Sequence, residues 1–309
     1  MKDKISKIMN NKVKKILIIV NIILIFGILE FYICRLIHFY RIENPKVNAD
    51  ISLADYITLD KNITVSGSGL YKKDDKYIFI GSDVNNYLYY SGILWRIIEV
   101  NDNSIKLITD DIQTSIFWGN DLNYNNSYIR GWLNPDSNIN HTGIFYQNLN
   151  NPELYLNKSD FCYGKVSDAS YNCEEKQNDY VGLLTINEYE RARGKESYLN
   201  IGSYFWTINT SDDNIWYVLD TGELNDNAFT EQNYYSYGVR PVINLKKDIN
   251  FISGDGSQSN PYIIDKNYSN LLSSKRVGEY VNYSGYNFRI IEKDNSNVKL
   301  ALDGFIKNN

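Results

Sequence analysis

Residues 85–111 read NNYLYYSGILWRIIEVNDNSIKLITDD, and residues 278–304 repeat them as GEYVNYSGYNFRIIEKDNSNVKLALDG. Aligned without gaps, 11 of the 27 positions are identical. Both copies read as strand, Ser-Gly turn, strand, Asn/Asp-rich turn and strand. The sequence therefore predicts one three-stranded β-meander twice, with residues 277–309 as a partial repeat of residues 84–116. The identical pairs are Tyr87/Tyr280, Tyr90/Tyr283, Ser91/Ser284, Gly92/Gly285, Arg96/Arg289, Ile97/Ile290, Ile98/Ile291, Glu99/Glu292, Lys106/Lys299, Leu107/Leu300 and Asp110/Asp303.

The second copy is too short to fold alone, because about 30 residues cannot bury a core of their own. It must either pack on the preceding domain or begin a domain that this chain does not complete. Both readings stay open from the sequence.

The composition is that of an ordinary globular protein. The 309 residues are 43% hydrophobic and 22% charged, which allows one large or two small domains. The formal net charge is −5, and phosphate binding needs a clustered Lys/Arg face, so a nucleic-acid partner is not expected. Twenty-seven tyrosines and only five prolines favour β-structure with long polar loops.

The N-terminal region predicts a membrane anchor. Residues 1–15 carry six lysines and one aspartate, and the run that follows is apolar to residue 33 except for Asn21 and Glu30. A helix over residues 16–40 is long enough to cross a bilayer. The lysine excess places the basic tail, residues 1–15, in the cytoplasm and the rest of the chain outside the cell. We expect a single-pass cell-membrane protein whose lipid partner is reached through residues 16–40. A cleaved signal peptide fits less well, since no small-residue cleavage site follows the apolar run.

Beyond the anchor, residues 41–66 read as a stalk and residues 67–268 as the folded domain. Three helices are expected within residues 41–268. One lies near residues 52–58, one over residues 127–133, and one begins at the capping box formed by Thr185 and Glu188. Strands are expected at residues 77–81, in the meander, and at residues 204–207, 215–219 and 239–245. The last contains Pro241, which a strand tolerates only at an edge or a bulge.

The cysteines and histidines limit the chemistry. Cys162 and Cys173 lie in a polar loop and are expected to form a disulfide, the alternative being two free thiols. His38 and His141 are far apart in sequence, so a metal site built on histidine is not expected. The sequence predicts no cofactor and no metal.

A set of motifs is spread over about residues 67–265. The motifs are Gly-Leu-Tyr at 69–71, Leu-Trp-Arg-Ile-Ile at 94–98, Asn-Asn-Ser with Trp-Leu-Asn at 132–134, Val-Gly-Leu-Leu-Thr at 181–185 with Glu188 and Tyr189, Tyr-Gly-Val-Arg-Pro-Val at 237–242, and Gly-Asp-Gly at 254–256 with Asn-Pro-Tyr at 260–262. The set resembles uncharacterised surface proteins of AT-rich Gram-positive bacteria, whose domain is similar to the formylglycine-generating-enzyme-like branch of the C-type-lectin-like fold.

The resemblance implies a compact α+β, C-type-lectin-like domain of short antiparallel sheets, two short helices and long loops. The transmembrane helix expected before it and the partial β repeat expected after it complete the predicted α+β architecture. The resemblance does not carry the family's chemistry over. Formylglycine-generating enzymes bind copper through two cysteines late in the domain, whereas Cys162 and Cys173 fall earlier. The calcium-dependent lectin motifs are only echoed, at residues 118–121 and 134–136.

Five aromatic residues flank polar loops, where a ring could stack on a sugar or a peptide. They are also suited to packing the loops themselves. Arg96 and Arg240 lie beside core strands, and pairing with an acidic residue on the same sheet is the expected role. The ligand-contact candidates are Trp118, Trp216, Tyr234, Tyr235 and Tyr237.

The leading functional hypothesis is a membrane-anchored, extracellular, non-catalytic domain that binds an envelope glycan or another surface protein. One alternative is an enzyme of the formylglycine-generating type acting on exported substrates. A second is a structural or assembly module of the cell surface. The absence of Ser-His-Asp, Cys-His and phosphate-loop motifs favours binding over catalysis.

Overall fold

The structure is a computed structural model, and it describes residues 51–136, 141–166, 173, 175–227, 229–230, 233–265, 277–278, 280–283, 286–293 and 298–303. The chain divides into two compact units, Met1–Lys46 and Val47–Asn309, and all of these residues belong to the second unit. We call it the globular unit.

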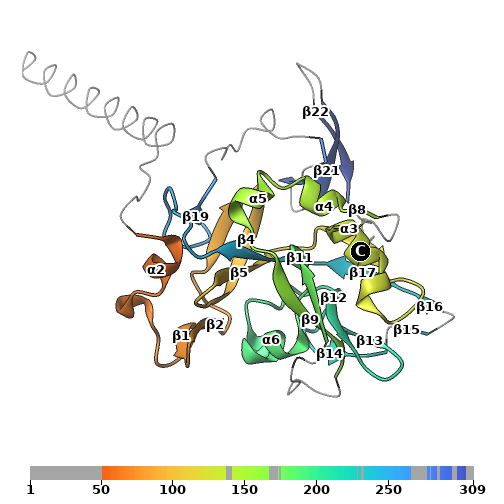
Figure 1. Ribbon diagram of the computed structural model, residues 1–309, viewed down its shortest axis with the longest axis horizontal. Coiled ribbons are helices and arrows are strands. Elements are labelled where there is room, and N and C mark those ends of the chain that lie inside the picture. Colours follow the sequence, from red (N-terminus) through yellow and green to blue (C-terminus); the bar gives the residue numbers. More distant parts are fainter. Residues whose placement is uncertain are drawn as a thin grey trace, which may run out of the picture. The chain divides into compact units, whose positions relative to one another are not determined.

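Two antiparallel-rich sheets form most of the globular unit (Figure 1). Sheet A has the strand order β1-β2-β4-β5-β18-β11, with β3 paired to β4 and β19 paired to β3. Its strands are β1 Gly69–Lys73, β2 Lys76–Ile80, β3 Tyr87–Tyr90, β4 Ile93–Val100, β5 Ser104–Thr109, β11 Val181–Gly182, β18 Val242–Lys246 and β19 Tyr262–Ile263.

Sheet B has the order β10-β9-β12-β13-β14, with β17 joining β12 to β6. Its strands are β6 Thr114–Phe117, β9 Ser159–Lys165, β10 Glu175–Asp179, β12 Phe205–Thr210, β13 Ile215–Val218, β14 Leu224–Asn225 and β17 Ser236–Val239. Three smaller ladders join β7 Pro135–Asp136 with β8 His141–Thr142, β15 Phe229–Thr230 with β16 Asn233–Tyr234, and β20 Tyr280–Tyr283 with β21 Tyr286–Lys293 and β22 Val298–Leu302.

The two sheets are joined by a paired ribbon. Strands β5 and β6 follow one another in the chain, as do β17 and β18, and β5 pairs with β18 while β6 pairs with β17. Between the sheets the pairing continues, since Thr109 N donates to Pro241 O and Gln113 N donates to Val239 O, at 3.0 and 2.9 Å. Pro241 therefore lies at the crossing, between two strands, where its missing N–H breaks no ladder. The single strand expected at residues 239–245 is in fact two.

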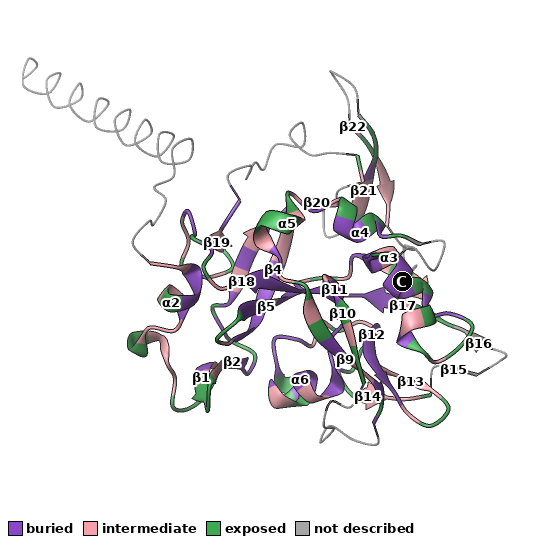
Figure 2. Cartoon of the chain, in the orientation of Figure 1, coloured by how far each residue is buried: buried purple, intermediate pink, exposed green. Residues whose placement is uncertain are grey.

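Large aromatic side chains fill the core, and Figure 2 shows burial concentrated in the central strands. Trp95, Trp118 and Trp206 are all fully buried, and Trp118 packs edge-on against Trp206 with ring centroids 5.7 Å apart. Burial of such rings is the main favourable term in folding a unit of this size.

The fold class corrects the α+β expectation. The described residues are mostly strand, and their α-helices are only four to six residues long. The polar stretch around Cys162, expected as a loop, forms the β9–β10 hairpin, and strand pairing across long sequence distances builds two large sheets. The five helices are α2 Leu53–Ile57, α3 Tyr128–Leu133, α4 Ile144–Gln147, α5 Pro152–Tyr155 and α6 Ile186–Arg191.

Three helices begin at residues that the capping pattern indicates. Ser52 and Ser127 cap α2 and α3 through their hydroxyl oxygens. Thr185 and Glu188 form both halves of the capping box at the start of α6. Helix α2 is buried against the core, with Leu53 N donating to Ile249 O at 2.8 Å. Residues 51–66, expected as a stalk, therefore belong to the globular unit.

The membrane assignment is also corrected. Within the ranges described above, no helix has the length and apolarity that crossing a bilayer requires. The span expected at residues 16–40 lies outside those ranges. The single-pass topology, the cytoplasmic tail and the extracellular placement therefore have no support in the structure.

The two meander copies have the same strand register. Tyr87 faces Arg96 across β3–β4 and Tyr280 faces Arg289 across β20–β21. A register shift follows Ile97 in β4 and, at the equivalent place, Ile290 in β21. Each arginine also lies over its facing tyrosine ring. The two sequence copies therefore share the same structure, including the register shift in their middle strands.

The two arginines next to core strands have different partners. Arg96 pairs with Asp110 at 3.3 Å and donates to the Asn86 side chain at 2.6 Å. Arg240 is almost fully buried and donates to backbone carbonyl oxygens instead: Thr109 O at 2.9 and 3.1 Å and Leu199 O at 2.6 Å. It lies at the sheet crossing and stacks over Phe205, 4.9 Å from the ring centroid. Its hydrogen bonds hold the crossing to the loop before β12.

We expect Arg240→Met to destabilise the globular unit by about 3 kcal/mol, because the carbonyl oxygens of Thr109 and Leu199 would stay buried without these charged donors. Urea denaturation measures the change. Lys247→Met is the control, because its exposed pair with Asp102 contributes little. An Arg240→Met protein with unchanged urea stability would show that the crossing does not depend on this residue.

Candidate functional site

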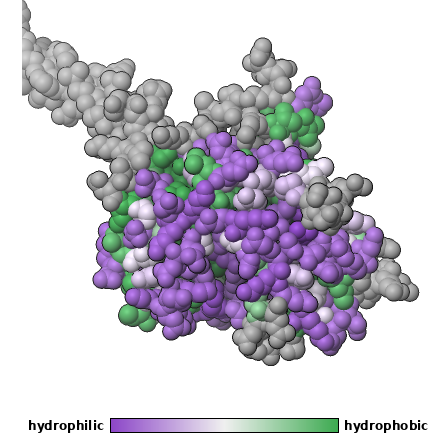
Figure 3. Space-filling view, viewed as in Figure 1, coloured by the Kyte–Doolittle hydropathy of each residue, from purple (hydrophilic) through white to green (hydrophobic). Residues whose placement is uncertain are grey.

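A polar pocket of about 740 Å³ opens between the β4–β5 hairpin of sheet A, the β9–β10 hairpin of sheet B and the start of α6. None of the described residues that line it is aromatic or aliphatic. Its lining residues are the acids Asp75, Glu99, Asp102, Asp160 and Glu188, the bases Lys76, Lys106, Lys158 and Arg191, the amides Asn101, Asn103, Asn157, Asn178, Asn187 and Asn244, the hydroxyl residues Ser104, Ser159 and Thr185, and the pair Cys162 and Cys173. Figure 3 shows the same hydrophilic character over much of this face.

Glu99 forms one side of the pocket and is held by three segments of the chain. Its Oε1 forms an ion pair with Lys76 Nζ at 3.2 Å and accepts a hydrogen bond from Asn101 Nδ2 at 3.0 Å, and its Oε2 accepts from Arg191 at 2.7 Å. The carboxylate is buried, and these donors come from β2, the β4–β5 turn and α6. Glu99 therefore ties α6 to sheet A.

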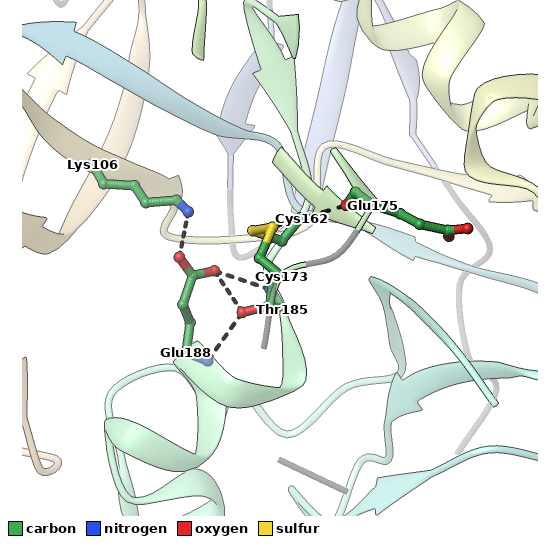
Figure 4. The surroundings of a disulfide bond; sticks show 6 residues. All are labelled: Lys106, Cys162, Cys173, Glu175, Thr185 and Glu188. Atoms are coloured by element: carbon green, nitrogen blue, oxygen red, sulfur yellow. Dashed lines mark hydrogen bonds and ion pairs between the residues drawn. A yellow bond between two sulfur atoms is a disulfide. The ribbon is translucent and has the colours of Figure 1, made fainter. Parts of the chain in front are cut away.

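Glu188 forms the opposite side. Its Oε2 accepts from the Thr185 N–H and hydroxyl, each at 3.0 Å, and its Oε1 accepts from Lys106 Nζ. Figure 4 shows Lys106 and Glu188 pointing toward one another beside the disulfide. Burial alone would raise the pKa of the Glu188 carboxyl, but the Lys106 charge and the hydrogen bonds outweigh it, and the pKa is lowered. Glu188 is thus ionised at neutral pH.

The disulfide expected between Cys162 and Cys173 is present, and it joins the two sides of the β9–β10 hairpin at the pocket wall (Figure 4). Closing this short loop stabilises the hairpin by about 3 kcal/mol on the chain-entropy model. The pocket is therefore walled by a covalently closed hairpin rather than by a free loop.

The residues predicted as ligand contacts lie elsewhere. Trp118 is fully buried in the core between Tyr124 and Trp206, so it has no ring face open to an external ligand. Trp216 is half-buried, and its indole N–H donates to Val166 O at 3.2 Å. Tyr234 lies in β16, and its side chain is outside the described part of the chain.

Tyr235 and Tyr237 belong to a stacked series of tyrosine rings on sheet B. Tyr235 is 40% exposed and stacks on Tyr237 with centroids 5.5 Å apart and planes 10° apart. Tyr237 stacks in turn on Tyr217, at 4.6 Å, and on Tyr204, at 5.4 Å. We call these four residues the tyrosine stack. It presents one exposed ring, Tyr235, and three rings that pack mostly on each other.

The described residues hold no cluster of three or more His, Cys, Asp or Glu side chains arranged to bind a metal ion. The calcium-lectin echo at residues 134–136 is structural at Asn134, whose amide bonds the backbone of Val181 at 2.7 and 3.0 Å. Asp255 lies in a turn, where hydrogen bonds from Ser257 lower the pKa of its carboxyl.

The sequence marks Cys162 and Cys173 as a disulfide and Thr185 and Glu188 as a capping box, but it does not show that these residues share a pocket. Lys76, Glu99, Lys106 and Arg191 come from four different segments, and only the fold brings them together. One signal was available. Glu99 and Lys106 are identical in both meander copies, and charged identities within a short strand repeat are more informative than its apolar ones.

The lowered pKa of Glu188 predicts how stability depends on pH. A carboxyl whose folded-state pKa lies below its unfolded value of 4.5 adds stability above that pH, and this stability is lost as the pH falls through the folded pKa. Glu188→Gln removes this contribution. The wild type should therefore exceed Glu188→Gln in urea stability at pH 7, and the difference should shrink below pH 4.5.

Glu190→Gln, an exposed change on the same helix, is the matched control and should stay close to the wild type at both pH values. A gap between wild type and Glu188→Gln that remains constant or widens in acid would contradict the assigned ion pair.

Comparison with known proteins places this chain in no family. No family model matches the sequence, and no solved structure matches the fold. The sequence is similar to a MATH and LRR domain-containing protein of Plasmodium falciparum, at 23% identity over 260 residues. That match covers 76% of this chain but only 2% of the Plasmodium protein's length. The likeness to formylglycine-generating-enzyme-like domains is not tested by these comparisons and stays a prediction.

Proposed function

We propose that the globular unit is a non-catalytic binding domain and that its polar pocket takes a polyhydroxylated ligand of the saccharide class. The single observation that carries this proposal is the lining of the pocket. Among the described residues that line it, eighteen of twenty offer charged, amide or hydroxyl groups, and the other two form the disulfide.

The chemistry of the lining matches sugar hydroxyl groups. A hydroxyl both donates and accepts hydrogen bonds, and so does each of the six asparagine amides that line the pocket. The described lining holds five acids and four bases, so a neutral polar ligand meets little net charge. Its side chains are mainly polar, in contrast to the mostly apolar sites of common cofactors.

The state of the two buried carboxylates supports binding rather than catalysis. General acid catalysis needs a carboxyl that holds a proton at neutral pH, usually one with a raised pKa. Glu188 has a lowered pKa and accepts from Lys106 and Thr185, and both oxygens of Glu99 accept hydrogen bonds. We infer that these groups hold the pocket walls together and are not the reacting pair of a hydrolase.

One observation bears on the alternative of a formylglycine-generating enzyme: Cys162 and Cys173 lie on the pocket wall. Copper ligation by cysteine requires thiolates. In this structure the two sulfur atoms are bonded to each other, so the copper chemistry is not favoured over a wall-closing role.

Saturation-transfer NMR with a panel of soluble neutral hexose and N-acetylhexosamine oligosaccharides tests the proposal. We expect binding by the wild type and about tenfold weaker binding by Asn178→Ala, which removes an exposed amide from the pocket wall. Gln177→Ala is the matched control, because Gln177 is the adjacent residue in β10 and does not line the pocket.

Tyr235→Ala separates the pocket from the tyrosine stack. Binding that is lost in Tyr235→Ala and kept in Asn178→Ala would move the site to the stack and overturn the pocket. A panel that gives no signal with the wild type would overturn the saccharide proposal itself.

A further inference from the structure

The second meander lacks a neighbour that the first copy has. In the first copy, β5 pairs with β4 on one side and with β18 on the other. In the second copy, β22 pairs with β21 on one side, and among the described residues no strand pairs with its other side. Because the two copies share their register and their bulge, the open edge of β22 corresponds to the edge of β5 that β18 covers.

The burial of the side chains differs between the two copies in the same way. Ile98 is 1% exposed in the first copy, whereas its counterpart Ile291 is 46% exposed. Val298, Leu300, Ala301 and Leu302 of β22 are each only partly buried, while Ile105, Leu107 and Ile108 of β5 are fully buried. An edge strand with exposed apolar side chains is a template for a further strand.

The charged residues show what is missing. In the first copy, Glu99 and Lys106 face each other across the strands but form ion pairs elsewhere, with Arg191 and Glu188 of α6. In the second copy, the equivalent Glu292 and Lys299 pair with each other at 3.3 Å, and both are exposed. Among the described residues, neither Glu292 nor Lys299 has another ion-pair partner. This arrangement leaves the second meander able to accept a further element of structure.

The second meander nevertheless packs against other elements of the globular unit. A small cavity of about 10 Å³ lies between Tyr280 and Arg289 of the second meander and Trp132 and Phe145 of the domain. Ile290 of β21 is fully buried. The meander thus contacts Trp132 and Phe145 through β20 and β21, and no described strand pairs with the outer edge of β22, which Figure 1 shows standing clear of the large sheets.

We propose that the edge of β22 binds an extended, aliphatic peptide segment of a partner protein as an antiparallel strand, in the manner that Val242–Lys246 covers β5. The sequence Val-Ile-Asn-Leu-Lys of β18 defines the chemistry of the partner strand, because it is what this fold places against the same edge. The chain's own β18 cannot serve, since β5 and β11 already occupy both its sides. Main-chain hydrogen bonds give the affinity and alternate aliphatic side chains the selectivity.

The test uses the full chain and a fluorescein-labelled peptide of residues 240–248, RPVINLKKD. We expect saturable binding by fluorescence anisotropy and, in hydrogen exchange, slower exchange of the β22 amides when the peptide is present. A peptide with Ile243→Pro should bind about tenfold more weakly, because proline removes a ladder hydrogen bond. The amides of β1, an edge strand of sheet A, are the internal control and should not change.

Three outcomes would overturn the proposal: no saturable binding, protection at β1 or elsewhere instead of β22, or equal binding of the proline peptide. Sedimentation equilibrium tests the other possible occupant of the β22 edge, a second copy of this chain. A concentration-dependent dimer that buries β22 would show that a second copy of this chain, and not a partner strand, covers the edge. No residue of β22 lines the polar pocket. A negative result in the peptide test therefore leaves the saccharide proposal unaffected, and a negative result in the saccharide test leaves the peptide proposal unaffected.

Discussion

The ribbon formed by β5–β6 and β17–β18 is the constraint on which the rest of the structure depends. It pairs residues 104–108 with residues 242–246 in sheet A and residues 114–117 with residues 236–239 in sheet B. Backbone hydrogen bonds from Thr109 N to Pro241 O and from Gln113 N to Val239 O lie on the two sides of the crossing. Arg240 lies where the ribbon passes from one sheet to the other, and its guanidinium donates hydrogen bonds to main-chain carbonyl oxygens. A charged side chain buried this way is costly unless each donor is satisfied, so its environment specifies one arrangement of the two sheets.

The polar pocket is a consequence of that arrangement. Pairing of β18 with β5 places Asn244 beside Ser104, whose hydroxyl lies 3.3 Å from the amide oxygen, and it places Lys106 within reach of α6. The β9–β10 hairpin, attached to β12, closes the other wall. Opposite charges from separate segments then form ion pairs along the wall, and asparagine side chains line much of the rest. The ion pairs hold the walls of the pocket together, which agrees with the proposed recognition of a polar ligand.

Local features of this chain are readable from sequence because local chemistry determines them. The meander strands follow from alternating apolar residues and Ser-Gly and Asn/Asp turns, and the starts of α2, α3 and α6 follow from Ser52, Ser127 and the Thr185–Glu188 box. The central position of β18 in sheet A could not be predicted from the sequence. Pro241 indicates an edge strand or a bulge, and only the fold shows that it lies between β17 and β18. The sheet content was underestimated because pairings between distant segments leave no mark on hydrophobic periodicity, and aromatic residues next to polar loops, such as Trp118, look alike whether they face the core or the solvent.

Hydrogen exchange of the native chain, followed by NMR, tests the central role of the ribbon most directly. If the β5–β18 pairing holds the two sheets together, the amides of Ile105, Leu107, Ile243 and Leu245 should belong to the slowest exchanging class and should open only with global unfolding, while β20–β22 exchange earlier. Exchange of the β18 amides well before those of β3 and β4 would contradict the account, because the ribbon would then be an addition to an independently stable meander.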